Sequence, residues 1–206
     1  MPRKKRIWYP GAIYHVISRG NRRAAIFREE TDYIFFLNYL NKIKQKYPFK
    51  IHSMCLMTNH FHMLIETERI ELWRIMQKVL SIYATEYNHK YHYSGHLFGG
   101  RYSAHIIENE KYLLDASRYI HLNPVKAKMV SNPEKYEYSS YPVYVNDGDS
   151  EEDYGQAAGL IYSMVDTERI LGMFGDNKSF YREFVESRIE SDDQDDDDDV
   201  LELEEA

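Results

Sequence analysis

A short apolar run with two histidines, one residue apart, places the strongest constraint on how this chain can fold. Residues 60–65 read His-Phe-His-Met-Leu-Ile, and such a run predicts a β-strand, in which successive side chains point to opposite faces. His60 and His62 would then project from one face, while Phe61 and Ile65 enter a core on the other. The register is fixed, because a slip by one residue would bury both histidines.

The two histidines alone allow two interpretations. Side chains two residues apart on a strand have Cβ atoms roughly 6 to 7 Å apart on one face, so two such imidazoles can bind one metal ion. They can equally be half-buried strand residues with ordinary hydrogen bonds. A third ligand and a chemical task elsewhere in the chain are needed to decide.

The other elements follow from apolar periodicity and from turn residues. Strands are predicted for residues 12–19, 50–57, 60–67 and 102–108, and helices for residues 33–46, 69–89 and 110–123. The order strand-helix-strand-strand-helix-strand matches the ferredoxin-like (split βαβ) pattern of an α+β fold, an antiparallel sheet with two helices on one face. The second hairpin strand is then interior to the sheet. Pro124 is expected to end or bend the further helix at Asn123.

Charge divides the chain into two unequal parts. Residues 1–145 hold 22 Lys and Arg against 12 Asp and Glu, a net +10, whereas residues 146–206 hold 4 against 21, a net -17. A basic part with many of the chain's 19 tyrosines suits a nucleic acid, whose bases stack on rings. Solvated surface charge and core tyrosines are the alternative explanation.

This division also predicts the domain organisation. Residues 1–145 are expected to form the functional domain, residues 146–189 a linker with a helical appendage, and residues 190–206 a disordered acidic tail. Two short helices are predicted in the appendage, over residues 161–174 and 179–189. The tail either competes with nucleic acid for the basic face or keeps the protein soluble.

Two classes of protein are disfavoured by what the sequence lacks. No run approaches the ~20 apolar residues of a membrane helix, and no apolar stretch of a signal peptide follows the basic N-terminus. A cytoplasmic protein without a membrane partner is therefore expected. The one cysteine, Cys55, lies in an apolar run and is interpreted as a core residue rather than a nucleophile.

The last predicted helix offers the missing chemical groups. Tyr119 and Asn123 are four residues apart and so share a helix face. The amide oxygen of Asn123 could complete a site begun by His60 and His62. Such a mixed nitrogen and oxygen set suits Mg²⁺ or Mn²⁺, ions that can still bind phosphate oxygens. Taken alone, Tyr119 could also be an amphipathic core tyrosine.

Four segments in order make the sequence similar to a known family. They are residues 11–21, residues 57–62, residues 95–102 and residues 119–125, which read Tyr-Ile-His-Leu-Asn-Pro-Val. Together they resemble the HUH single-tyrosine transposases, and within them the REP-associated tyrosine transposases of the insertion-sequence 200-like superfamily. The resemblance covers roughly residues 7–145.

This resemblance implies a reaction and a set of roles. The hydroxyl of Tyr119 would attack a phosphodiester of single-stranded DNA at a hairpin-containing site, leaving a 5′-phosphotyrosine and a free 3′-hydroxyl that can later rejoin the strand. A divalent ion on His60, His62 and Asn123 would assist, because a phenol with a pKa of about 10 is a poor nucleophile at neutral pH.

The resemblance leaves the surface contacts and the assembly less defined. The family binds imperfect DNA hairpins, and four arginines are candidates for phosphate contacts on charge and location. They are Arg19, Arg22, Arg23 and Arg101. A monomer and a homodimer with Tyr119 supplied in trans both remain open.

Two rival functions have features in the sequence. The spacing His60-x-His62-x3-Glu66 matches part of the metal motif of cupins, although cupins consist of many short strands and this chain predicts long helices. A domesticated, non-catalytic hairpin-binding protein would share the fold. A pure binder has no chemical reason to keep His60, His62 and Tyr119 together, so the full set favours an active endonuclease and strand transferase.

Overall fold

The four strands of the protein form one antiparallel sheet. The computed structural model describes residues 7–147 and 155–189. The strands β1 (Ile13–Arg19), β2 (Phe49–Met57), β3 (His60–Thr67) and β4 (Ser103–Ile106) lie in the order β2-β3-β1-β4. β3 pairs with both β1 and β2 and is interior, as predicted. The ferredoxin-like α+β fold predicted from the sequence is confirmed.

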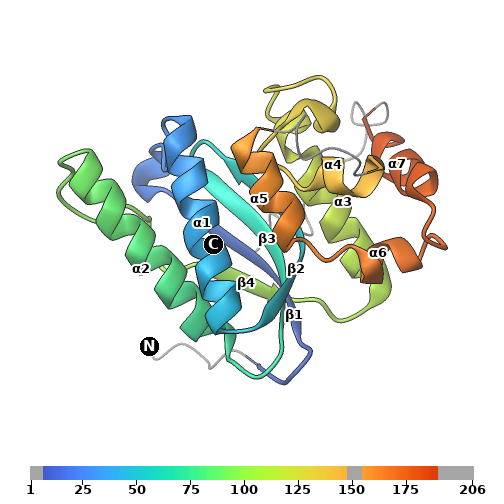
Figure 1. Cartoon of the computed structure of the whole chain (residues 1–206), viewed down its shortest axis with the longest axis horizontal. Helices are drawn as coiled ribbons and strands as arrows, with labels where there is room; N and C mark the ends of the chain where they lie inside the picture. The colour runs from blue at the N-terminus through green and yellow to red at the C-terminus, as the bar shows by residue number, and fades with distance from the viewer. Residues whose placement is uncertain (1–6, 148–154, 190–206) are drawn as a thin grey trace.

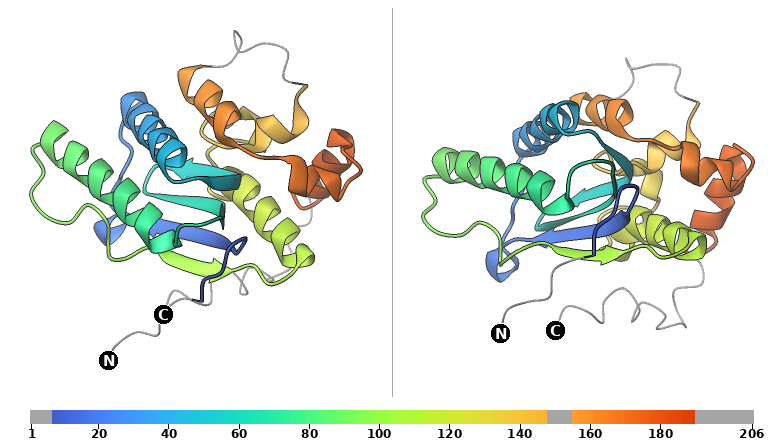
Figure 2. Two further views of the ribbon diagram at one scale, coloured as in Figure 1. Left: turned by 60° about the horizontal axis from the view of Figure 1, so that its bottom comes forward. Right: turned by 90° about the horizontal axis from the view of Figure 1, so that it is seen from below.

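Helices cover both faces of this sheet. Two helices, α1 (Glu30–Lys46) and α2 (Leu72–Lys90), lie side by side on one face (Figure 1). Figure 2 shows α3 (Glu110–Lys126) on the opposite side. The alternation of β3 explains both layers, because Phe61 packs in the core under α1 and α2 whereas Leu64 packs in a second core with α3. This second face is the one that also carries His60 and His62.

The chain of α3 continues through its proline. Pro124 lies inside the helix, which ends at Lys126, and the backbone N–H of Ala127 still bonds to the carbonyl of Asn123 at 3.0 Å. Of the two alternatives predicted for Pro124, an end of the helix at Asn123 is therefore wrong, and a bend there stays a prediction. Both residues are buried in the core, and this packing outweighs the local preference of a residue before proline for extended backbone.

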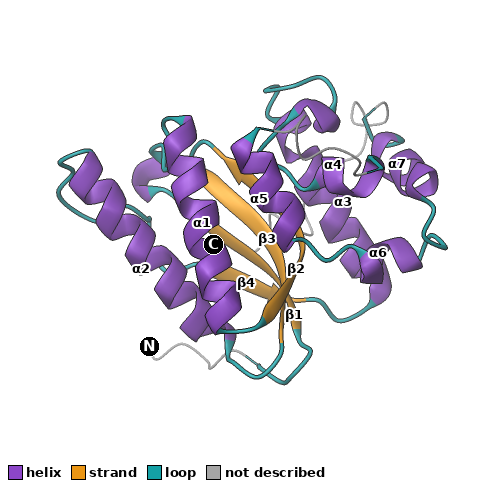
Figure 3. Cartoon of the chain, in the orientation of Figure 1, coloured by secondary structure: helices purple, strands orange, loops and turns teal. Residues whose placement is uncertain are grey.

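Smaller helices close the second core. After the turn η2 (Pro133–Lys135) come α4 (Tyr141–Val145), α5 (Gln156–Met164), α6 (Glu168–Gly172) and α7 (Lys178–Glu186), drawn in Figure 3. α5 packs beside α1, and α7 contacts α3 and α4. The predicted helix over residues 179–189 corresponds to α7. The predicted helix over residues 161–174 is wrong, because the chain forms the end of α5 and the separate helix α6 there.

The remaining expectations from the sequence concern Cys55, the domain boundaries and membrane helices. Cys55 is fully buried in the core, as predicted. The predicted tail over residues 190–206 lies outside the described residues, and the domain boundary at residue 145 stays a prediction. No helix within residues 7–147 and 155–189 has the length and apolar character needed to span a membrane.

Candidate active site

The strand β3 presents its two histidines at the face covered by α3. The imidazole rings of His60 and His62 are 4.9 Å apart between centroids, with their planes at 85°. His62 is buried, at 2% exposure, and His60 is half-buried at the first position of the strand. Phe61 points into the opposite core. The predicted register of this strand is therefore confirmed.

The helix α3 brings the other two predicted residues to these histidines. The ring of Tyr119 lies 5.5 Å from that of His62, and Oδ1 of Asn123 lies 3.4 Å from Nε2 of His60. α3 is held over the sheet by its apolar side, because Ala116 and Ile120 pack in the second core. The four residues selected from the sequence thus meet in one place.

A third histidine of the site had no role assigned from the sequence. His15, on β1, is fully buried; its Nε2 lies 3.0 Å from Nδ1 of His62, and its ring lies 6.0 Å from that of Tyr119. His15 lies on the same face as Ile17, which is the Cα partner of His62. The signal that could have found it was the alternation of β1, once β1 is placed next to β3.

Burial keeps two of these imidazoles neutral. It lowers the pKa of His15 to about 3, with a smaller contribution from His105. Burial also lowers the pKa of His62 well below its ordinary value, and the neighbouring His15, His60 and Arg19 add to this effect. A neutral imidazole keeps one nitrogen lone pair, and that lone pair is what a metal ion binds.

The donor set fits a divalent cation. Adjacent ligands of an octahedral Mg²⁺ ion, each at about 2.0–2.1 Å, stand roughly 3 Å from one another, and Nε2 of His60 and Oδ1 of Asn123 are 3.4 Å apart. No cluster of three or more His, Cys, Asp or Glu side chains suited to a metal occurs within the described residues. The candidate set differs from such a cluster because one of its donors is an amide.

The glutamate of the cupin-like spacing is engaged elsewhere. Glu66 lies four residues beyond His62, which is roughly 13 Å along a strand. Its Oε2 contacts Nε2 of His52 at 2.8 Å and Nη1 of Arg169 at 3.3 Å. Glu66 therefore cannot share an ion with His60 and His62, and the cupin interpretation loses its third ligand.

Positive side chains flank Tyr119 and the histidines. Arg19, the last residue of β1, is the Cα partner of His60, and its charge contributes to the low pKa of His62. Nζ of Lys126 lies 5.3 Å from the centre of the Tyr119 ring. A phosphate entering the site would meet both charges.

A basic turn follows β1 directly. It is the turn η1 (Asn21–Arg23), in which the exposed Arg22 and Arg23 adopt left-handed backbone conformations, with φ of 53° and 59°. A Cβ at Gly20 would lie 2.0 Å from the carbonyl oxygen of Ala24, so only glycine permits this tight turn. The predicted phosphate contacts of both arginines stay predictions.

Arg101 lies in a different surface feature. It lines a cavity of about 980 Å³ together with Trp73, Leu97 and Phe98, and neither Tyr119 nor the site histidines line this cavity. The cavity adjoins the basic turn, because the backbone N–H of Asn21 bonds to the carbonyl of Leu97 at 2.8 Å. Arg101 and the turn are therefore neighbours on one surface.

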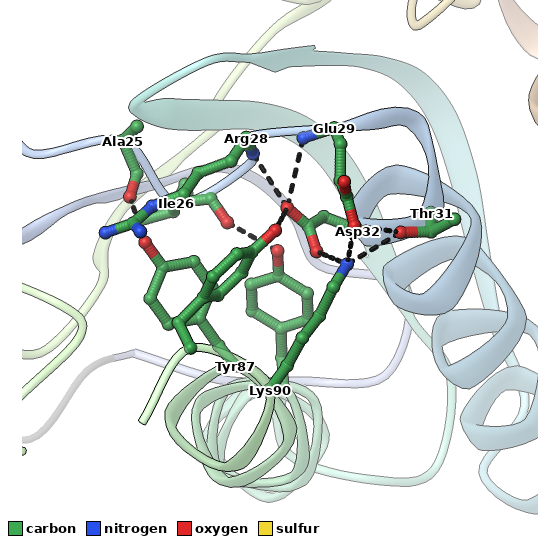
Figure 4. Close-up of polar contacts among 10 residues, drawn as sticks. Ala25, Ile26, Arg28, Glu29, Thr31, Asp32, Tyr87 and Lys90 are labelled. Atoms are coloured by element: carbon green, nitrogen blue, oxygen red, sulfur yellow. Dashed lines mark hydrogen bonds and ion pairs between the residues drawn. The ribbon is translucent and has the colours of Figure 1, made fainter. Parts of the chain in front are cut away.

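The segment after the basic turn is fixed to α2, as Figure 4 shows. Oδ2 of the buried Asp32 accepts a hydrogen bond from the backbone N–H of Arg28 at 2.7 Å, and its Oδ1 pairs with Lys90 at 2.5 Å. Tyr87 donates to the carbonyl of Ala25 at 2.9 Å. These contacts fix residues 25–32, which follow Arg22 and Arg23, against α2.

A buried polar network joins α3 to α7, in the region predicted as a helical appendage. Oη of Tyr181, on α7, lies 2.7 Å from Oγ of Ser117 and 2.8 Å from Nδ1 of His121. Nε2 of His121 lies 2.8 Å from Oγ of Ser140. His121 stands between Tyr119 and Asn123 in the sequence, so this network fixes the rotation of the helix that carries them.

Comparison with known proteins gives consistent matches. Residues 9–123 match the family model described as "Transposase IS200 like". A Haemophilus influenzae protein named as a REP-associated tyrosine transposase is 29% identical over 138 residues, which cover 61% of this chain and 78% of that protein. The solved structure of a REP-associated tyrosine transposase bound to a REP hairpin superposes with a TM-score of 0.61 at 21% identity. That match covers 75% of this chain and 92% of the other, and it supports the fold alone.

Proposed function

The chain belongs to the IS200-like transposase family, as its motifs predicted, and from this premise we propose that it cleaves and rejoins single-stranded DNA through a covalent bond to Tyr119. The observation that carries the proposal is the position of Tyr119, whose ring lies 5.5 Å from that of His62. A potential nucleophile thus stands beside a donor set suited to a divalent ion. A nucleophile placed beside the groups that activate it is typical of covalent catalysis.

The proposed step exchanges one phosphoester for another. The phenol oxygen of Tyr119 loses its proton and attacks the phosphorus. The bond from phosphorus to the 3′ oxygen breaks, and that 3′ oxygen takes up a proton. The products are a 5′-phosphotyrosine and a free 3′-hydroxyl, which can attack the same phosphorus to reverse the step. Because one ester replaces another, no nucleotide cofactor is needed to rejoin the strand.

The side chains around Tyr119 have distinct parts in this step. His60, His62 and Asn123 would hold Mg²⁺ or Mn²⁺, which when bound supplies positive charge to the non-bridging oxygens of the phosphate. Arg19 lies opposite His60 in the sheet and is the nearest candidate to bind the entering strand.

The proposed substrate is DNA that contains a hairpin. This rests on the name of the solved relative, which was bound to a REP hairpin, and on the exposed charges of Arg22 and Arg23 in the turn after β1 and of Arg101 near that turn. Tyr119 and the two histidines of one chain lie together, which supports a tyrosine supplied in cis; the homodimer considered from the sequence stays a prediction. The expected cytoplasmic location stays a prediction.

A covalent capture assay tests the proposal. With Mn²⁺ and single-stranded hairpin oligonucleotides, the protein is expected to form an adduct that survives a denaturing gel, and EDTA is expected to suppress it. Tyr119→Phe should abolish the adduct while the far-ultraviolet circular dichroism and DNA binding persist. Binding without any adduct over a broad panel of hairpins would instead support the domesticated, non-catalytic binder.

A further inference from the structure

Both candidate metal-binding histidines contact a second polar side chain through Nδ1. For His60 that partner is Asn59, at 2.6 Å, and for His62 it is His15, at 3.0 Å. We propose that Asn59 and His15 are positioning residues: Asn59 holds His60 in the tautomer that presents its Nε2 lone pair to a metal ion, and His15 accepts the Nδ1 proton of His62 when the ion binds. This inference rests on the proposed function and adds two residues to it.

The direction of the Asn59 contact follows from how its amide is held. Nδ2 of Asn59 donates to the carbonyl oxygen of Arg23 at 3.2 Å, which turns Oδ1 toward His60. A carbonyl oxygen only accepts, and two lone pairs would repel one another at 2.6 Å. Nδ1 of His60 must therefore carry the proton. The lone pair left on its Nε2 and Oδ1 of Asn123, 3.4 Å apart, are then two electron-rich atoms that converge on the place where a cation would stand.

The carbonyl that orients Asn59 belongs to the basic turn. The backbone N–H of Gly20 bonds to the carbonyl of Asn59 at 2.8 Å, and that of Arg23 bonds to the carbonyl of Gly20 at 3.0 Å. Gly20, Arg23 and Asn59 are thus joined by three hydrogen bonds, which link the left-handed Arg23 to the turn between β2 and β3. A basic surface feature and one of the proposed metal ligands are joined through a single amide.

The His15 contact acts on the second imidazole. A ring that binds a cation through Nε2 must carry its proton on Nδ1, and in His62 that proton can only be donated to Nε2 of His15 at 3.0 Å. Nδ1 of His15 is buried and has no hydrogen-bond partner among the described residues. The contact with His62 is thus the one hydrogen bond of this ring in the described part of the chain, and the bound ion decides its direction.

This arrangement matches the general behaviour of metal sites. A ligating histidine usually donates its second N–H to a neighbouring acceptor, which sets both the tautomer and the orientation of the ring. Loss of such an acceptor commonly weakens metal affinity by about 10 to 100-fold. Asn59, in the turn before β3, and His15, on β1, would fill this part for the two histidines.

Paired variants separate positioning from a purely structural role. Asn59→Asp keeps an acceptor for His60 but loses the donor to Arg23, whereas Asn59→Leu loses both. Manganese affinity, followed by the electron paramagnetic resonance of free Mn²⁺, is expected to fall about 10 to 100-fold in Asn59→Leu and to stay within about threefold of wild type in Asn59→Asp. If the two variants lose affinity equally, Asn59 only fastens the turn and the inference is overturned.

The same design applies to His15. His15→Gln can still accept from His62 and is expected to stay close to wild type, while His15→Leu should lose about 10 to 100-fold in Mn²⁺ affinity. His89→Gln, at an exposed position on α2, is the control for the loss of one imidazole and should leave the affinity unchanged. Thermal unfolding of every variant identifies any that has lost its fold.

Nitrogen-15 spectra of the imidazoles give a readout independent of activity. The metal-free protein should show the proton of His60 on Nδ1, and the Mg²⁺-loaded protein should show the proton of His62 on Nδ1 as well. A proton on Nε2 of His60 in the metal-free protein would overturn the inference while leaving DNA cleavage possible. Failure of wild type to bind Mn²⁺ would instead overturn the metal step of the proposed function, and the inference with it.

Discussion

The ring of Tyr119 stands at 79° to the ring of His62, with the two centroids 5.5 Å apart. One residue comes from a helix and the other from the interior strand of the sheet. Ile120 follows Tyr119 in the sequence, and Leu64 lies on the same strand face as His62. Both belong to one apolar cluster, so neither element can shift without disturbing a packed core. The proposed nucleophile and the proposed metal ligand are thus held in place by the packed core.

Asn123 is expected to act as an oxygen donor to the ion. Asn123→Ala should weaken Mn²⁺ binding about tenfold, and Asn123→Asp should strengthen it, because hard cations prefer charged oxygen ligands. Isothermal titration of the metal-free protein measures both. Asn38→Ala removes an amide from α1 and serves as the control; an equal loss in that variant would contradict a direct role for Asn123.

The basic turn is expected to bind phosphate without regard to sequence. Arg22→Gln and Arg23→Gln should each weaken hairpin binding and each reduce the slope of log K against log salt by about 0.7 to 1, the value for one phosphate contact. Fluorescence anisotropy over a series of salt concentrations gives the slope. Lys42→Gln on α1, at an exposed position, should leave it unchanged, and unchanged slopes in the arginine variants would refute the assignment.

Tyr181 is expected to stabilise the fold through its hydroxyl. Tyr181→Phe leaves Ser117 and His121 without the oxygen that both contact, and an unsatisfied buried polar group costs about 1–3 kcal/mol. The free energy of unfolding in urea should fall by about 2 kcal/mol. Tyr9→Phe, at a position that is 48% exposed, should change it little; equal effects of the two would argue against the network.

The stability of the protein is expected to fall in mild acid because of His121. Burial lowers the pKa of His121 to about 3 in the folded state, whereas an unfolded chain has a histidine pKa of about 6.5. Below about pH 6.5 the unfolded chain binds more protons than the folded protein. The free energy of unfolding therefore falls as the pH falls, by about 1.4 kcal/mol per pH unit for one such group.

The variant His121→Gln isolates this contribution. Between pH 7 and pH 5 it should lose about 2 kcal/mol less stability than wild type, which corresponds to the titration of one group over that interval. Urea unfolding at both pH values measures the difference, with His89→Gln as the control at an exposed site. Parallel losses in His121→Gln and wild type would mean that other groups dominate.

Local patterns predicted much of the site. The alternation around Phe61 gave the strand and the shared face of His60 and His62, and the spacing of four residues placed Tyr119 and Asn123 on one side of a helix. These are short-range consequences of strand and helix geometry. They needed no knowledge of which elements pack together.

Long-range contacts account for what the sequence could not predict. His15 joins the site only because β1 pairs with β3. The predicted helix over residues 161–174 is interrupted because Val165 bridges to Ile51 and the backbone N–H of Asp166 bonds to the carbonyl of Ile51 at 2.8 Å. Pro124 remains helical because its surroundings are packed. In each case a tertiary contact overrides a local preference.

Mass spectrometric mapping of the DNA-linked peptide tests the central claim most directly. The chain has 19 tyrosines, and the account predicts that, after reaction with a hairpin oligonucleotide and Mn²⁺ and digestion of the DNA, the residual 5′-phosphate is found on Tyr119. An adduct on another tyrosine, or an adduct that still forms in Tyr119→Phe, would contradict the assignment of Tyr119 as the nucleophile.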